Sequence, residues 1–179
     1  MNIFHQTDNH VSEQTANYVF QQAIKCEWKT RRLYILFSKM FESIPRVSTF
    51  WIELAKDEEN HAKTLIQIQE SMTKQQLNNK ADKELLGNIR KVLSFFKKIS
   101  TDQFKTLDDA YELAHELESS EINSVFKILA TNFISDETLK EITISQLGNH
   151  VEKLIKFNEN IGNRTWRKEV IAHNLVYQL

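Results

Sequence analysis

Glycine and proline are almost absent from this chain. Its 179 residues include three glycines and one proline, whereas a β-sandwich or barrel of this length needs many such residues at its turns. Apolar residues make up 41% of the chain, which is enough to bury one hydrophobic core. The sequence therefore predicts a single all-α domain.

Apolar residues recur at helical spacing in four long segments. We expect helices over residues 11–43, 46–75, 107–131 and 135–159. Pro45 separates the first two, because proline disfavours helical geometry in the residue before it and suits the first turn of the next helix. Such a short link predicts an antiparallel helix pair.

The connection between the second and third predicted helices is much longer, and its apolar cluster at 85–96 predicts a short helix within it. One long crossover of this kind is the topology of a ferritin-like four-helix bundle. We expect this bundle to span residues 1–164. The tail, residues 165–179, is expected to add a short helix to the same domain.

Charge and cysteine content exclude several functions. Lysine and arginine total 23 against 24 acidic residues, a formal net charge of −1, so no excess attracts nucleic acid or an anionic membrane. Cys26 is the only cysteine and cannot form an internal disulfide or a cysteine-ligated metal site. With no signal peptide and no long apolar run, we expect a cytoplasmic protein that binds neither nucleic acid nor membrane.

Six ionisable residues lie on the apolar faces of the predicted helices, where an unpaired carboxylate is costly to bury. They come from all four long helices and are Glu27, Glu58, His61, Glu118, Glu121 and His150. Glu58 and His61 are three residues apart, so both can face one ion. Because carboxylate and imidazole ligands suit iron or manganese, the pattern predicts a metal site in the bundle core.

Other interpretations of these residues stay open. Glu58 and His61 could form a hydrogen-bonded core pair without metal. Glu27 could pair with Arg31, one helical turn later. Tyr34 lies seven residues after Glu27 on the same face, so it is either a hydrogen-bond donor to a ligand or an ordinary core aromatic residue.

Two parts of the chain resemble a known family. The segments AIKCE at 23–27 and FWIELAKDEENHA at 50–62 resemble the first helix pair of the rubrerythrin family. The segment AHELESSE at 114–121 is similar to that family's third helix. The resemblance covers about residues 20–70 and 107–129.

The resemblance implies a ferritin-like bundle with a non-haem di-iron centre that reduces peroxide or activates dioxygen, often in a dimer. It also implies the ligands from the first three helices, which are Glu27, Glu58, His61 and Glu118, with Glu121 either a further ligand or a hydrogen-bond acceptor beside them. Arg31 and Tyr34 are expected to adjust these ligands.

The fourth predicted helix departs from the family's pattern. The family carries a second Glu-x-x-His there, whereas this chain keeps His150 but has Leu147 in place of the glutamate. One bridging carboxylate is therefore missing. Either Glu121 compensates or the second ion binds weakly, and a mononuclear or metal-free site is a further alternative, in which His150 is a core histidine.

The expected function is a di-iron oxidoreductase, with manganese as an alternative metal because it shares these ligands. The chain has no rubredoxin-like cysteine module, so electrons would come from a separate protein. The substrate would be peroxide or dioxygen, and a homodimer is expected. The competing hypotheses are an iron-binding or storage protein and a metal-free bundle that serves as an interaction scaffold.

Overall fold

The computed structural model describes residues 14–100, 103–134, 136–147 and 149–161, and these are helical without any β-strand. The helices are α1 (Ala16–Met40), α2 (Pro45–Ser71), α3 (Lys74–Asn78), α4 (Lys83–Phe96), α5 (Leu107–Glu118), α6 (Glu121–Phe133), α7 (Glu137–Leu147) and α8 (Asn149–Ile161). The all-α bundle predicted from the sequence is confirmed. The predicted tail helix lies outside the described residues.

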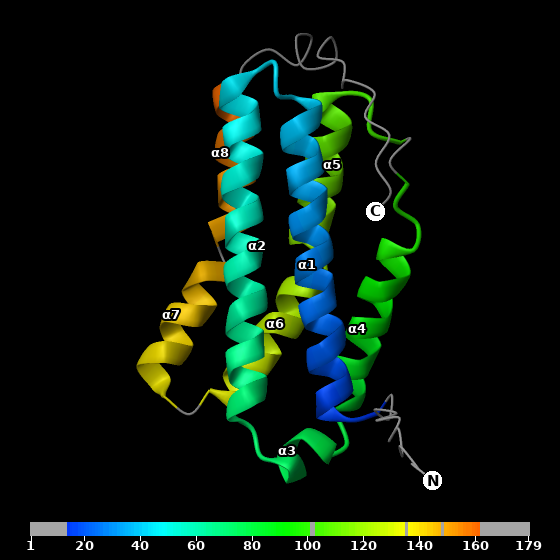
Figure 1. The fold of residues 1–179 in the computed structure, drawn as a ribbon, viewed down its shortest axis with the longest axis vertical. Coiled ribbons are helices and arrows are strands. Elements are labelled where there is room, and N and C mark those ends of the chain that lie inside the picture. The colour runs from blue at the N-terminus through cyan, green and yellow to red at the C-terminus, as the bar shows by residue number, and fades with distance from the viewer. Residues whose placement is uncertain (1–13, 101–102, 135, 148, 162–179) are drawn as a thin grey trace, which may run out of the picture.

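Helices α1 and α2 form a long antiparallel pair (Figure 1). The side chain of Thr15 caps α1 by accepting a hydrogen bond from the backbone N–H of Tyr18, and Pro45 occupies the first turn of α2. The pair encloses packed aromatic rings: Trp51 stacks with Tyr34 at 5.7 Å and meets Phe37 in an edge-to-face contact at 5.1 Å, measured between ring centroids. The predicted antiparallel pair is therefore present.

The long crossover between α2 and α5 contains α3 and α4. Asp82 caps α4 by accepting hydrogen bonds from the backbone N–H groups of Glu84 and Leu85. Apolar residues of α4 are buried where it packs against α1 and α6 (Figure 1). The crossover thereby carries the chain from the end of α2 back along the bundle, so that α5 begins at the opposite end.

The third and fourth helices are not continuous, contrary to the sequence prediction. The helix predicted over 107–131 is divided into α5 and α6 at Ser119 and Ser120. Serine hydroxyls compete for backbone hydrogen bonds, and Ser120 donates to the carbonyl of Leu117 at 2.6 Å. The helix predicted over 135–159 is divided into α7, which ends at Leu147, and α8, which begins at Asn149. The residue between them in the sequence is a glycine, a residue type with weak helix propensity. Residue 148 itself lies outside the described residues.

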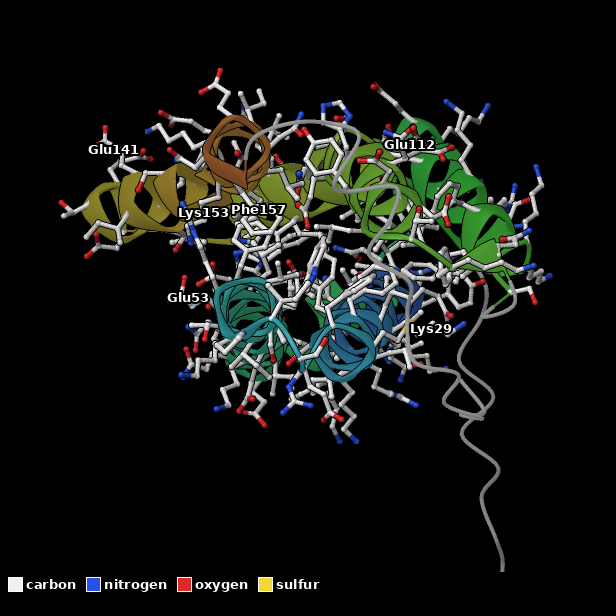
Figure 2. The ribbon with its side chains drawn as sticks, turned by 90° about the horizontal axis from the view of Figure 1, so that it is seen from above. Lys29, Glu53, Glu112, Glu141, Lys153 and Phe157 are labelled. Carbon is white, nitrogen blue, oxygen red and sulfur yellow. The ribbon has the colours of Figure 1, made fainter. Side chains whose placement is uncertain are left out.

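Both breaks fall near the middle of the bundle (Figure 1). Seen along its length, the bundle has two layers, with α1 and α2 in one and α4, α5, α6 and α8 in the other (Figure 2). Side chains fill the space between the layers. None of the described helices has the length and apolar character that a membrane crossing requires.

Candidate metal centre

Five of the six predicted ligands converge in the middle of the bundle. Glu27 comes from α1, Glu58 and His61 from α2, Glu118 from the end of α5, and His150 from the start of α8. All five are buried, and the most exposed of them, Glu118, has a relative exposure of 6%. The sixth, Glu121, is the first residue of α6, and its side chain lies outside the described residues.

Glu58 lies at the centre of this cluster because it approaches both imidazoles. Its Oε2 is 3.6 Å from Nδ1 of His61, and its Oε1 is 3.1 Å from Nδ1 of His150. The two rings stack with centroids 4.9 Å apart. Beyond them, Glu27 Oε2 lies 3.7 Å from Nδ1 of His61, and Glu118 Oε2 lies 3.1 Å from Nδ1 of His150. The cluster thus has two halves, each with one histidine and one glutamate, that share Glu58.

Two carboxylate oxygens in the cluster lack a hydrogen-bond donor among the described residues: Oε2 of Glu27 and Oε1 of Glu58. The 3.1 Å contact of Glu58 with His150 does not remedy this, because the same Nδ1 makes its hydrogen bond with Glu118. A buried oxygen without a donor costs about 1–3 kcal/mol, and more when it is charged. A bound cation would remove this cost.

The donor set fits a metal ion. One ligand atom from each of Glu58, His61 and His150 lies within 4.8 Å of the others, close enough for these side chains to belong to one metal site. Carboxylate oxygen together with imidazole nitrogen suits Fe²⁺ or Mn²⁺. The unpartnered oxygens and the donor chemistry therefore agree with the metal site predicted from the sequence.

The electrostatics of the cluster are those of a site that requires positive charge. Burial, together with the neighbouring Glu58, raises the pKa of Glu27 well above its usual range. Burial alone would raise the pKa of Glu58, but the contacts with the two imidazoles lower it by more and hold it well below the usual range. The surrounding carboxylates also outweigh burial at the histidines, raising the pKa of His61 to about 9 and that of His150 to about 12. Protons thus neutralise the cluster, and a divalent cation can replace them with proton release.

Tyr34 touches a candidate ligand directly. Its hydroxyl donates to Oε1 of Glu118 across 2.5 Å, and the side chain is fully buried. Burial and the neighbouring Glu118 carboxylate raise the pKa of Tyr34 well above its usual range, which keeps the hydroxyl protonated and able to donate. Of the two interpretations of Tyr34, this geometry favours the hydrogen-bond donor.

Arg31 pairs with a glutamate outside the cluster. Its Nε donates to Oε2 of Glu59 at 3.0 Å, and both side chains are 30% exposed. Because a guanidinium is costly to bury, the pairing takes place at the partly exposed edge of the α1–α2 pair. Among the described side chains, Arg31 therefore pairs with Glu59 and not with Glu27. That Arg31 adjusts the cluster stays a prediction.

Sequence reasoning missed two residues that touch the cluster. Asp57 lies with Oδ2 3.4 Å from Nε2 of His150, and Asn123 donates from its side-chain amide to the backbone carbonyl of Glu118. Asp57 is about 100° around the helix from Glu58 and so falls outside the apolar stripe. Its position directly before the Glu-x-x-His spacing was the only signal available. Asn123 follows the α5–α6 break. A helical pattern that is continued through this break does not give the direction of the Asn123 side chain.

Comparison with known proteins agrees with this architecture. A model of the rubrerythrin family matches residues 19–142, which is more than half of the chain. The chain belongs to the rubrerythrin family. The matched region contains Glu27, Glu58, His61 and Glu118 but ends before His150. For this rubrerythrin-family chain, the evidence that His150 of α8 belongs to the cluster therefore comes from the structure and not from the family match.

A solved structure has a similar fold, that of a provisionally assigned ferritin-like diiron-carboxylate protein from Thermotoga maritima. The two chains share 15% identity with a TM-score of 0.56, over 83% of this chain and 97% of the other. At that identity the likeness shows the fold alone. A search of curated protein sequences finds no match. Family membership and the glutamate–histidine cluster together support a metal site of the kind found in non-haem di-iron proteins.

The predicted departure in the fourth helix falls at the α7–α8 break. Leu147 is the last residue of α7, and its side chain lies outside the described residues. His150, by contrast, enters the cluster from the first turn of α8. The histidine predicted in the fourth helix thus reaches the cluster from the start of α8.

Proposed function

We propose that this rubrerythrin-family protein is a non-haem di-iron oxidoreductase that acts on peroxide or dioxygen. The observation that carries the proposal is the buried cluster in which Glu58 approaches both imidazoles while two carboxylate oxygens lack donors. In this proposal Glu27 and His61 would hold one ion, Glu118 and His150 would hold the other, and Glu58, which approaches both histidines, would serve both. Manganese could occupy the same ligands.

The iron ions, when bound, supply the electrons for reduction of the substrate's O–O bond. The chain's own residues provide charge, orientation and exclusion of water. The carboxylates neutralise the ions, and Tyr34 holds Glu118 by a hydrogen bond to Oε1. The ring of Phe126 lies 5.1 Å from that of His61, so an apolar wall closes this side of the cluster and keeps the reacting groups from bulk water.

A separate protein is proposed to supply the electrons. Cys26 is the chain's only cysteine, and burial, with the adjacent Glu27 carboxylate, raises the pKa of Cys26 to about 12. Its thiol therefore stays protonated and is a poor redox group. The resemblance to rubrerythrins also favours a homodimer.

The proposal is tested by elemental analysis of protein expressed with iron and manganese and purified without chelator. About two irons per chain are expected, as in di-iron bundles, together with iron oxidation that is faster with peroxide than with dioxygen. Oxidation mainly by dioxygen with mineral growth would support storage instead. A stable bundle without metal would support the scaffold hypothesis and refute the proposal.

A matched pair of variants separates the cluster from the rest of α2. Glu58→Gln keeps the size of the side chain but removes the shared charge, so metal content and peroxide turnover should both fall. Glu59→Gln changes the next residue, which pairs with Arg31 and Lys63 outside the cluster, and should leave both quantities unchanged. Equal metal content and turnover in Glu58→Gln and the unmodified protein would refute the assignment of Glu58 as the ligand that serves both ions.

A further inference from the structure

Asp57 lies beside the cluster but is not one of its proposed ligands. Its Oδ2 is 3.4 Å from Nε2 of His150, and the same oxygen also contacts Nζ of Lys153. His150 and Lys153 are one turn apart on α8, whereas Asp57 belongs to α2. Lys153 lies in the space between α8 and α2 (Figure 2). Asp57 therefore links two donors of α8 to the helix that carries Glu58 and His61.

His150 occupies an unusual position for a ligand, because it is the second residue of its helix. Side chains on an α-helix lie over the turn that precedes them. Helix α7 ends at Leu147 and α8 begins at Asn149, so no preceding turn of α8 supports the imidazole. Its orientation depends on side chains from other helices.

The two ring nitrogens of His150 face different surroundings. Nδ1 is 3.1 Å from both Glu58 Oε1 and Glu118 Oε2, inside the cluster. Nε2 faces Asp57, whose side chain is 28% exposed at the edge of the α2–α8 contact. A neutral imidazole binds a metal through one nitrogen while the other carries the proton, and a hydrogen-bond acceptor decides which nitrogen that is.

We propose that Asp57 is a positioning residue for the metal centre: it accepts a hydrogen bond from Nε2 of His150 and so directs Nδ1 toward Glu58 and Glu118 as the metal-binding atom. The inference rests on the proposed function, since it requires the cluster to bind metal. It assigns Asp57 a role distinct from that of a surface ion pair with Lys153. Lys153 is 44% exposed, and exposed pairs of this kind contribute little to stability.

The test is a titration of the metal-free, full-length chain with Mn²⁺, in which free Mn²⁺ is followed by electron paramagnetic resonance. Asp57→Ala should weaken binding at the His150 half of the cluster by about 10- to 100-fold, the usual effect of losing a partner of a ligating histidine. Lys153→Ala is the matched control, because it removes the ion pair and keeps the contact of Asp57 with His150. It should bind Mn²⁺ like the unmodified protein.

A double variant makes the test specific to the histidine. In a His150→Ala background, Asp57→Ala should cause no further loss of Mn²⁺ affinity, because the imidazole on which Asp57 acts is absent. Circular dichroism spectra of the folded, metal-free proteins should show the same helical content for Asp57→Ala and the unmodified chain. An additional loss in the double variant, or an equal loss in Lys153→Ala, would overturn the inference, since Asp57 would then act by tying α8 to α2.

The unmodified chain distinguishes this inference from the proposed function. If it binds neither Mn²⁺ nor Fe²⁺, the proposed function fails and the inference fails with it. If it binds metal and Asp57→Ala binds equally well, only the role of Asp57 is refuted. If Asp57→Ala alone weakens binding, both the metal centre and the positioning role are supported.

Discussion

The two helix pairs of this bundle place their ligands by different means. In the α1–α2 pair both helices are continuous, with 25 and 27 residues, and their ligands lie near the middle of each. In the opposite layer the ligands lie at breaks: Glu118 is the last residue of α5, and His150 is the second residue of α8. A continuous helix holds its ligands by its own periodicity, whereas a ligand at a helix end depends on contacts from neighbouring helices.

The largest expected effect concerns the packing that supports the continuous pair. Trp51 is fully buried, with its ring centroid 5.7 Å from Tyr34 and 6.0 Å from Phe157 of α8. Trp51→Ala should lower the free energy of unfolding by about 3–5 kcal/mol, as is usual for deletion of a buried aromatic side chain, measured by urea denaturation. Ile52→Ala, at a neighbouring position that is 36% exposed, should change it by less than about 1 kcal/mol. Similar values for the two variants would contradict this packing model.

The second prediction compares the two halves of the cluster. Glu27 and His61 are held by continuous helices, so we expect their half to bind its ion more tightly than the half with Glu118 and His150. In an Fe²⁺ titration without oxygen, Glu118→Gln should weaken the weaker of two binding steps and leave the tighter one unchanged. Glu27→Gln should weaken the tighter step by about tenfold or more, equivalent to about 1.4 kcal/mol. The reverse order would show that helix continuity does not determine affinity.

A smaller loss of stability than that of Trp51→Ala is expected at the contact that joins the two layers at Glu118. Tyr34→Phe removes the hydroxyl that donates to Oε1 of Glu118 and leaves that buried oxygen without its donor, at a cost of about 1–3 kcal/mol in the metal-free protein. Urea denaturation measures the loss. Tyr18→Phe, on the same helix but only partly buried, is the comparison and should have little effect. If Tyr34→Phe were no less stable than Tyr18→Phe, the assigned role of Tyr34 would be contradicted.

The smallest effect concerns the start of α5, the half-helix that carries Glu118. Thr106 and Asp109 form a reciprocal capping box there, and Thr106→Ala should cost about 1 kcal/mol of stability. Hydrogen bonds from the backbone N–H groups of Lys105 and Thr106 outweigh burial and lower the pKa of Asp109.

Because the folded-state pKa of Asp109 is lowered, its contribution is present above the usual carboxyl range and is lost as the pH falls toward the lowered pKa. The difference in thermal midpoint between the unmodified protein and Asp109→Asn should therefore decrease on acidification below about pH 4. A difference that grows in acid would contradict this assignment.

The continuous pair is also the part that could be predicted best. Helical periodicity placed Glu27, Glu58 and His61 on facing stripes, and Pro45 marked the short link between α1 and α2. In the opposite layer the same reasoning identified Glu118 and His150 but predicted unbroken helices around them. A periodic pattern continues through a break because the apolar residues on either side still face the core, so periodicity alone does not reveal that α5 ends at Glu118 or that α7 ends at Leu147.

The contacts around the cluster were less predictable than its ligands. Arg31 follows Glu27 by one turn, so spacing along α1 favoured a pair, yet Glu59 of α2 takes its hydrogen bond. Asp57 lies off the apolar stripe of α2 and still reaches His150 of α8. In both cases the partner belongs to another helix, and spacing within one helix carries no information about it.

By itself the sequence determined that this chain is helical, that its first two long helices are antiparallel, and that five of the predicted glutamates and histidines face the core. These properties follow from local chain stiffness and from the periodic burial of apolar surface. Only the tertiary structure decided where the third and fourth helices break, which imidazole nitrogen faces the carboxylates, and which neighbours orient each ligand. These depend on distances between residues far apart in the sequence, which are set when the two layers pack together.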